Sequence, residues 1–305
     1  MKVLVLGGTG MVGSSVCRLL GSKPDKYEII APSRRELDLT DKAAVYEFFK
    51  NNRGIDAVIV AAALVGGIGA NSSNNLGFLN FNLEITQNSI NAASFSGINK
   101  LIYLGSSCIY PKEAEQPIKE EALLTGPLES TNEGYALAKI CGVQMCKYYS
   151  QMNVDYTALM PCNLYGPGDN YDLHTSHVFP ALIRRFSEAG NSPELTIWGT
   201  GRPRREFLHV DDVAAACELM LNTKPKHHIY NVGYGSDITI EELAYKLKEL
   251  SGYKGKIKFD TSKPDGTMRK LMDSSRMHSL GWQPKITLDD GLRMTYKDYT
   301  KSNFI

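Results

Sequence analysis

Short runs of β-branched and other apolar residues recur along the first half of the chain, separated by longer segments whose apolar residues return every three or four positions. The short runs are typical of buried strands and the longer segments of amphipathic helices. The predicted strands span 3–6, 28–30, 57–60, 101–104 and 156–160. Because strands of a buried parallel sheet are apolar on both faces, this alternation predicts an α/β fold, a doubly wound parallel sheet covered by helices.

The pattern changes after residue 161, where Gly, Pro, Asn and His become frequent. The elements expected there are helices at 178–189, 211–221, 239–250 and 288–300 and strands at 195–198 and 229–232. The helix at 211–221 and the strand at 229–232 fit a return of the chain to the sheet. We therefore predict a larger domain at 1–164 plus about 206–235, and a smaller C-terminal lobe at about 165–205 plus 236–305.

Charge and cysteine content exclude several classes of function. The 305 residues include 34 Lys and Arg against 33 Asp and Glu, so the chain has no excess of positive charge for binding nucleic acids or anionic membranes. Its six cysteines are scattered without a CxxC pair, which predicts a reducing compartment, the cytoplasm, and neither a disulfide framework nor a metal site. No apolar stretch is long enough to span a bilayer, and 1–8 indicate a strand rather than a signal peptide.

A glycine-rich turn follows the first predicted strand and opens a helical segment. Gly7, Gly10 and Gly13 are evenly spaced there, so the backbone can approach a pyrophosphate while the helix N-terminus supplies free N–H groups. A tight turn without a ligand is the alternative, because short glycine motifs also occur by chance. The predicted cofactor contacts in this turn are Gly7, Gly8, Thr9, Gly10, Met11, Val12 and Gly13.

The residues expected beside the adenosine ribose favour NADP over NAD as the cofactor. NAD-binding domains of this kind place an acidic residue about 20 positions beyond the glycines, and this chain has Pro32-Ser33-Arg34-Arg35 there. The guanidinium of Arg34 is a planar, permanently charged donor that suits the 2′-phosphate of NADP. The alternative is that both arginines belong to a solvated loop.

A tyrosine and a lysine one helical turn apart form a candidate catalytic pair. Tyr135 and Lys139 share a helix face, and a phenol, whose pKa is ordinarily about 10, exchanges protons near neutral pH when a cation stabilises its anion. Lys139 and an oxidised nicotinamide would supply this positive charge. The spacing alone occurs by chance in many helices. However, Ser106 ends the fourth predicted strand, at the edge where open α/β sheets bind ligands, and its hydroxyl can donate to a carbonyl oxygen.

The glycine turn, the strand-end serine and the tyrosine–lysine pair, in this order, resemble the extended short-chain dehydrogenase/reductase superfamily over the whole chain. Further strings at 163–167, 209–212 and 280–282 match the same superfamily. Within it, the sequence resembles the GDP-L-fucose synthase family. The strings that carry this second resemblance are 62–68, 105–111, 176–178, 198–201, 205–209 and 262–267.

The resemblance implies a reaction, a cofactor and an assembly. GDP-L-fucose synthases epimerise GDP-4-keto-6-deoxy-D-mannose at C3 and C5 and then reduce C4 with NADPH. A homodimer through the helix of Tyr135 is the expectation for this family. The larger domain would then be a Rossmann-type NADP-binding domain and the C-terminal lobe would bind the substrate, a GDP-linked 4-keto-6-deoxy sugar.

The resemblance also assigns roles to individual residues. The catalytic residues are Ser106, Cys108, Tyr135, Lys139 and His177, with Cys108 as base and His177 as acid. Cofactor contacts outside the glycine turn are Arg34, Asp38, Leu39, Ala62, Leu104, Gly105, Ser106, Ser107, Tyr135, Lys139, Pro161, Cys162, Asn163, Leu164 and His177. Substrate contacts are Arg185, Trp198, Arg205, Asp265 and Lys270. Thiol and imidazole groups, with ordinary pKa values of about 8.5 and 6.5, suit proton transfer at carbon, which also requires a stabilised enolate oxygen.

Ordinary alternatives exist for these residues, and two positions depart from the family pattern. Cys108 could be a buried small side chain, His177 an ordinary helix-start residue, and Arg185 part of a solvated helix face. Thr9 stands where some family members carry arginine, which leaves more of the NADP preference on Arg34. Cys162 stands where threonine is usual beside the nicotinamide.

Two rival functions fit parts of the same pattern. A sugar-nucleotide 4-epimerase or 4,6-dehydratase would hold NAD, but the acidic residue for NAD is missing and Ser107-Cys108 stand where dehydratases commonly carry Asp-Glu. A redox-sensing binding protein would keep the glycine turn but would have no reason to retain the catalytic residues together.

Overall fold

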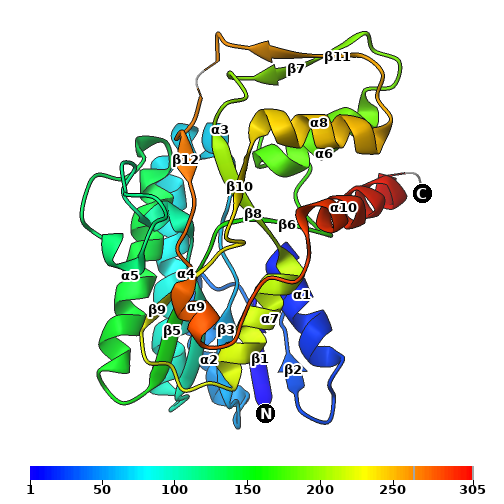
Figure 1. The fold of residues 1–305 in the computed structure, drawn as a ribbon. Coiled ribbons are helices and arrows are strands. Elements are labelled where there is room, and N and C mark those ends of the chain that lie inside the picture. Colours follow the sequence, from blue (N-terminus) through cyan, green and yellow to red (C-terminus); the bar gives the residue numbers. More distant parts are fainter. Residues whose placement is uncertain (264, 304–305) are drawn as a thin grey trace.

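Six parallel strands form the central sheet of the computed structural model, which describes residues 1–263 and 265–303 (Figure 1). Their order is β2-β1-β3-β4-β5-β9, with bounds β1 (Lys2–Leu6), β2 (Glu28–Ile30), β3 (Ala57–Val60), β4 (Lys100–Leu104), β5 (Asp155–Pro161) and β9 (Ile229–Val232). The predicted α/β fold class is confirmed, and each predicted strand of this sheet agrees with the structure to within one residue at either end. Pro264 of the 262–267 string, and residues 304 and 305 of the predicted lobe, lie outside the described residues.

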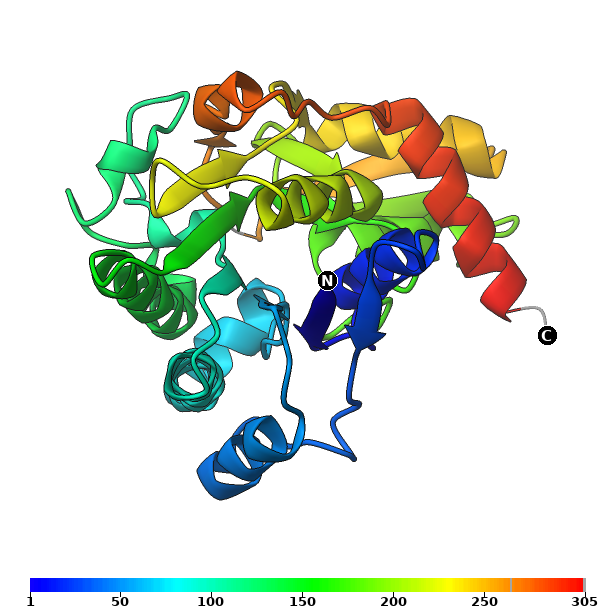
Figure 2. The ribbon, with the colours of Figure 1, turned by 90° about the horizontal axis from the view of Figure 1, so that it is seen from below.

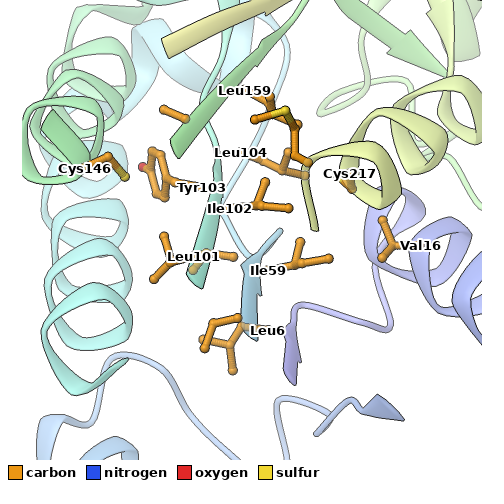
Figure 3. Packing of buried hydrophobic residues seen from close by; sticks show 14 of the residues in the cluster. Leu6, Val16, Ile59, Leu101, Ile102, Tyr103, Leu104, Cys146, Leu159 and Cys217 are labelled. Atoms are coloured by element: carbon orange, nitrogen blue, oxygen red, sulfur yellow. The ribbon is translucent and has the colours of Figure 1, made fainter. Parts of the chain in front are cut away.

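Helices cover both faces of this sheet, as Figure 2 shows from below. One face carries α1 (Met11–Gly21) and α7 (Val210–Leu221), and the other carries α2 (Lys42–Asn51), α4 (Asn75–Phe95) and α5 (Glu133–Ser150). Figure 3 shows strand side chains packed between residues of opposite helices, with Cys146 of α5 on one side and Val16 of α1 and Cys217 of α7 on the other. In the described part of the chain, no helix has the length and apolar character that crossing a membrane requires.

The order in which strands are added to the sheet reverses at β1, since β2 lies on one side of it and β3 on the other. A crevice at the carboxyl ends of the two strands is the usual ligand site of such a sheet. The loops that follow β1 and β3 meet there: Gly7 has φ of 85°, and a Cβ atom on it would lie 2.6 Å from the backbone nitrogen of Ala62. Glycine is therefore required at position 7 both by backbone conformation and by space.

A smaller group of elements lies beyond the carboxyl edge of the sheet (Figure 1). Its strands are β6 (Asn163–Tyr165), β7 (Glu194–Trp198), β8 (Arg204–His209), β10 (Asp237–Thr239), β11 (Lys256–Asp260) and β12 (Arg269–Lys270). Its helices are α6 (Val178–Glu188), α8 (Ile240–Ser251) and α10 (Leu288–Asn303). Aromatic and aliphatic side chains, including Phe179, Phe207 and Leu243, form a second core here, separate from that of the central sheet. The helices predicted at 178–189, 239–250 and 288–300 are all present.

A buried carboxylate fixes the strand that joins these two regions. Glu206 on β8 is 0 % exposed and accepts hydrogen bonds from the backbone N–H of Gly235 at 2.7 Å and of Met272 at 3.0 Å. Burial raises its pKa to about 7, against the lowering effect of these donors. These hydrogen bonds tie β8 to the segments that contain Gly235 and Met272, so the position of the neighbouring Arg205 on β8 is fixed as well.

Candidate active site

The turn after β1 has the geometry of a pyrophosphate cradle. A Cβ atom on Gly13 would lie 2.1 Å from the carbonyl oxygen of Gly7, so only glycine lets the first turn of α1 pack this closely against the strand end. Gly10 is the N-cap residue of α1 and has no side chain to occupy the first N–H groups of the helix. These groups and the positive end of the helix dipole fit a dinucleotide phosphate.

The loop after β2 presents the exposed Arg34, while the carboxylate of Asp38 is held in an internal turn. Arg34 is exposed, and its guanidinium lies 5.1 Å from the ring centroid of Phe81 on α4. Asp38 accepts hydrogen bonds from the backbone N–H and the hydroxyl of Thr40, at 3.0 and 2.8 Å. These bonds, with a smaller contribution from the charge of Arg34, lower the pKa of Asp38. Arg34 is thus available to an anionic ligand, and Leu39 beside this turn is buried.

At the end of β4 the structure brings the serine, tyrosine and lysine together. Ser106 begins the short 3₁₀ helix η1 (Ser107–Ile109), and its hydroxyl accepts a hydrogen bond from the backbone N–H of Cys108 at 3.2 Å. Lys139 on α5 is buried and donates to the carbonyl oxygen of Leu104 at 2.8 Å. Its Nζ atom lies 5.8 Å from the centroid of the Tyr135 ring. The predicted face of α5 therefore points at the carboxyl end of β4.

The pKa shifts of Tyr135 and Lys139 favour Tyr135 as a proton donor. Burial raises the pKa of Tyr135, the negative charge of Cys108 raises it further, and a hydrogen bond with Ser106 lowers it. Burial lowers the pKa of Lys139 to about 7. Tyr135 consequently retains its phenolic proton at neutral pH and can deliver it to an oxygen that becomes negative.

Cys108 lies within reach of a hydrogen-bond donor and a cation. The side-chain amide of Asn132 donates to the Cys108 sulfur at 3.2 Å. The charge of Cys108 also interacts with Arg205, whose own pKa is lowered by burial. Arg205 in turn donates to the carbonyl oxygen of Thr267 at 2.5 Å. The thiol is half-buried rather than packed in the core, which differs from the ordinary expectation for a structural cysteine.

His177 lies at the start of α6, in the smaller group of elements. It is the N-cap residue of α6, but its side chain makes no capping hydrogen bond. The segment before it is tied to the loop after β3, because the backbone N–H of Gly67 donates to the carbonyl oxygen of Thr175 at 2.8 Å. The imidazole is accessible to solvent yet surrounded by protein, and this partial loss of water lowers its pKa. A neutral imidazole can take up a proton and then, as the imidazolium, return it.

The predicted substrate contacts lie on several elements of the smaller group. Arg205 on β8 and Lys270 on β12 are paired in register. Trp198, at the end of β7, is 65 % exposed with the Lys263 ammonium 5.7 Å from its ring, so an indole face is available for stacking. Arg185 on α6 donates to the carbonyl oxygen of Thr196 at 2.8 Å. The Asp265 carboxylate already accepts two hydrogen bonds within the protein, from the backbone N–H of Thr200 at 2.9 Å and from its hydroxyl at 2.7 Å.

Comparison with known proteins places the chain in a family. Residues 3–233 match the NAD dependent epimerase/dehydratase family. The chain belongs to this family. It is 50 % identical over 308 residues to the GDP-L-fucose synthase of Escherichia coli (strain K12), covering 97 % of this chain and 95 % of that protein. It is also 50 % identical over 304 residues to a putative GDP-L-fucose synthase 2 of Arabidopsis thaliana, covering 99 % and 92 %.

A solved structure agrees with the fold of this member of the NAD dependent epimerase/dehydratase family. The structure of a GDP-L-fucose synthetase from Naegleria fowleri bound to NADP superposes with a TM-score of 0.90 at 26 % identity. The match covers 99 % of this chain and 95 % of that chain. The likeness therefore includes the smaller group of elements as well as the central sheet.

In this epimerase/dehydratase family member, the segment after β5 lines the same edge of the sheet. Pro161 ends β5, Cys162 is buried, and Asn163 and Leu164 form β6. Burial, with the nearby carboxylate of Glu206, raises the pKa of the Cys162 thiol. On the neighbouring strand, the backbone N–H of Gly105, which lies between Leu104 and Ser106, donates to the carbonyl oxygen of Leu159 at 2.9 Å, and Ser107 is buried. The cofactor contacts predicted at 104–107 and 161–164 thus lie on adjacent strand ends.

Two polar residues of the site were not predicted from the sequence. Asn132, which reaches Cys108, precedes a helix and would be taken for an N-cap residue. Glu206 lies within the string used for the family resemblance, but nothing in the pattern marks its carboxylate as wholly buried. The signal that the sequence offered was the position of Glu206 between Arg205 and the apolar pair Phe207-Leu208.

Proposed function

We propose that this chain is a GDP-L-fucose synthase, which converts GDP-4-keto-6-deoxy-D-mannose to GDP-L-fucose by epimerisation at C3 and C5 and NADPH-dependent reduction at C4. The observation that carries the proposal is a thiol beside the serine–tyrosine–lysine group: Cys108 is hydrogen-bonded by Asn132 and interacts with Tyr135. A reductase alone would need no second proton-transfer group at this place. The two relatives described above, named GDP-L-fucose synthase and putative GDP-L-fucose synthase 2 and each 50 % identical to this chain, support the assignment.

In the proposed epimerisation, the Cys108 thiolate removes the proton from a carbon next to the C4 ketone. The electron pair of that C–H bond forms a double bond to C4 while the π pair of the C4 carbonyl moves to its oxygen, and the hydroxyl groups of Ser106 and Tyr135 donate hydrogen bonds to this enolate oxygen. His177, which has first taken up a proton from solvent, donates it to the opposite face of the same carbon, and the C4 ketone forms again. Before the second inversion, Cys108 loses its proton to solvent and His177 takes one up, and the same steps then invert the other carbon.

In the proposed reduction, Tyr135 protonates the C4 oxygen while Lys139 holds the cofactor ribose and stabilises the phenolate that remains. Bound NADPH supplies the hydride. The cofactor would be held by the glycine turn at 7–13, with Arg34 on the 2′-phosphate. The space that a Cβ atom on Gly7 or Gly13 would fill, and the exposed guanidinium, support this fit.

The GDP group requires cations from a chain whose net charge is only +1. Arg185, Arg205 and Lys270 supply these cations in the proposal, and Trp198 supplies a stacking face. Asp265 is proposed to act on the substrate through the turn that it holds, since both of its oxygens already accept hydrogen bonds.

The assay that tests the proposed function follows the absorbance of NADPH during incubation with GDP-4-keto-6-deoxy-D-mannose. We expect oxidation of NADPH, and oxidation of NADH at least about tenfold slower, because a hydrogen bond to a charged group contributes about 1.5–3 kcal/mol. A 4-epimerase or a dehydratase would change the sugar without net consumption of NADPH. Absence of oxidation with both cofactors would contradict the proposal.

We propose a homodimer through α4 and α5. Apolar side chains lie exposed on these helices, among them Leu137 and Tyr148 of α5 and Phe95 of α4. Burial of such a patch in a symmetric contact is a common reason for its presence. Sedimentation velocity is expected to give the mass of two chains for the wild type and of one chain for Leu137→Glu; a wild-type monomer would contradict the dimer.

We also propose the division into an NADP-binding domain at 1–164 plus about 206–235 and a substrate-binding lobe at about 165–205 plus 236–305. The two separate cores support it, with one difference: Met272, Met277 and Trp282 pack in the core of the central sheet.

Cytoplasmic location is proposed from the six free thiols. Cell fractionation tests this location, and recovery of the protein outside the cytoplasm would contradict it.

A further inference from the structure

Asn132 occupies the start of α5 without doing what asparagine usually does at a helix start. Asparagine is among the preferred N-cap residues because its side-chain oxygen accepts a hydrogen bond from the first turn of the helix. Asn132 precedes the first residue of α5, but its backbone, with φ of −135° and ψ of 24°, lies outside the extended region usual for an N-cap residue, and its side chain accepts no capping hydrogen bond. Its amide nitrogen instead donates to the Cys108 sulfur at 3.2 Å, across 24 positions of sequence.

A residue of another helix caps α5 in its place. The side-chain oxygen of Asn75, at the start of α4, accepts from the backbone N–H of Gly134 at 3.1 Å. Gly134 permits this approach, because a Cβ atom on it would lie 2.2 Å from the carbonyl oxygen of Asn75. The side chain of Asn132 is therefore released from the helix and is free to turn towards Cys108.

The other end of the Asn132 amide is equally unusual. Its oxygen is buried, and among residues 1–263 and 265–303 it has no hydrogen-bond partner. Buried acceptors are normally satisfied in a side chain that serves only the fold. A buried amide oxygen without a described partner, together with an amide nitrogen that donates to the Cys108 sulfur, is therefore more typical of a functional residue than of a structural one.

We propose that Asn132 is a positioning residue for Cys108, whose amide N–H holds the sulfur in one orientation and stabilises the thiolate relative to the thiol. The proposal rests on the proposed function, in which Cys108 is the base. A sulfur anion accepts an N–H donor more strongly than a neutral thiol does. The titratable groups that interact with Cys108 are Tyr135 on α5 and Arg205 on β8. Asn132 adds a directional bond that neither of them provides.

The decisive variant is Asn132→Asp, because aspartate caps helices as well as asparagine does and has nearly the same shape. Its carboxylate cannot donate to sulfur and places a negative charge beside it. The measurement is the pH dependence of Cys108 alkylation by iodoacetamide in the substrate-free protein, read by mass spectrometry of the peptide that contains Cys108. We expect the pH midpoint of alkylation to rise by about one unit in Asn132→Asp and by less in Asn132→Ala. Deuterium exchange at C3 and C5 should fall at least about tenfold in Asn132→Asp.

A matched control removes a helix cap elsewhere. Thr239 caps α8 with a complete capping box, so Thr239→Ala should lower the melting temperature and leave the alkylation midpoint unchanged. A role in capping alone predicts the wild-type midpoint for Asn132→Asp, and that result would overturn the proposal. If Asn132→Asp does not fold, the midpoint of Asn132→Ala decides in the same way. If the wild type shows no deuterium exchange, the proposed function fails, while a shifted midpoint still supports the contact between Asn132 and the thiol.

Discussion

Cys108→Ser is expected to slow deuterium incorporation from solvent at C3 and C5 by about 10²–10⁴-fold, the usual contribution of a general base. A serine hydroxyl is a far weaker acid than a thiol, so the donor from Asn132 and the charge of Arg205 cannot make it ionise near neutral pH. The size of the site and the hydrogen bonds to the enolate oxygen remain. The measurement is nuclear magnetic resonance of the substrate in deuterated buffer, with the cofactor present in its oxidised form.

Cofactor binding provides the control for this variant. The turn at 7–13 makes no use of the Cys108 side chain, so the dissociation constant of NADPH should stay within about twofold of the wild type. His177→Asn is the companion variant: exchange at both C3 and C5 should persist, because Cys108 removes the proton at each carbon. Exchange at the wild-type rate in Cys108→Ser would remove Cys108 from the mechanism, whatever the reductase activity of the variant.

The central sheet could be predicted from the sequence because its strands form largely apolar runs. Strands such as β3 and β4 are buried on both faces, so nearly every residue in them is apolar and the run stands out from its neighbours. The glycine turn was equally recognisable, because Gly7 needs a positive φ and Gly13 cannot carry a Cβ atom. Such a requirement restricts the residue type at the position itself, so it can be recognised in the sequence.

The smaller strands could not be predicted in the same way. β6, β10 and β12 contain two or three residues each, too few to show a period of two. They are held by pairing with β8 and by ion pairs such as those of Asp237 with Arg204 at 2.7 Å and with Arg269 at 2.6 Å. These partners are more than 30 positions apart in sequence, so the pairs exist only once the chain has folded.

The same distinction applies to the candidate site. Tyr135 and Lys139 share one helix face, and their spacing alone predicts that they meet. The bond from Asn132 to Cys108 depends on Asn75 of another helix having taken over the cap, which no local pattern shows. His177 was placed by resemblance, and the tie between Gly67 and Thr175 that brings its segment towards the sheet is likewise a tertiary contact.

Tyr135→Phe is expected to lower the rate of NADPH oxidation by about 10²–10⁴-fold while exchange at C3 and C5 falls by a smaller factor. The phenolic proton is the only one that the proposed reduction transfers to the C4 oxygen, whereas the enolate of the epimerisation keeps the hydroxyl of Ser106 as a donor. Phenylalanine preserves the ring that lies 5.8 Å from the Lys139 nitrogen, so the packing of α5 against β4 should survive.

The readout that separates these two steps is the ratio of the exchange rate to the rate of NADPH oxidation, which should rise at least about tenfold in Tyr135→Phe. Ser106→Ala is the matched comparison, because it removes a hydrogen bond to the C4 oxygen but leaves the proton donor, and it should slow both steps by similar factors. An unchanged ratio in Tyr135→Phe would mean that the phenol acts only as a hydrogen-bond donor. The proton for C4 would then have to come from another group, and the assignment of Tyr135 as the acid of the reduction would be wrong.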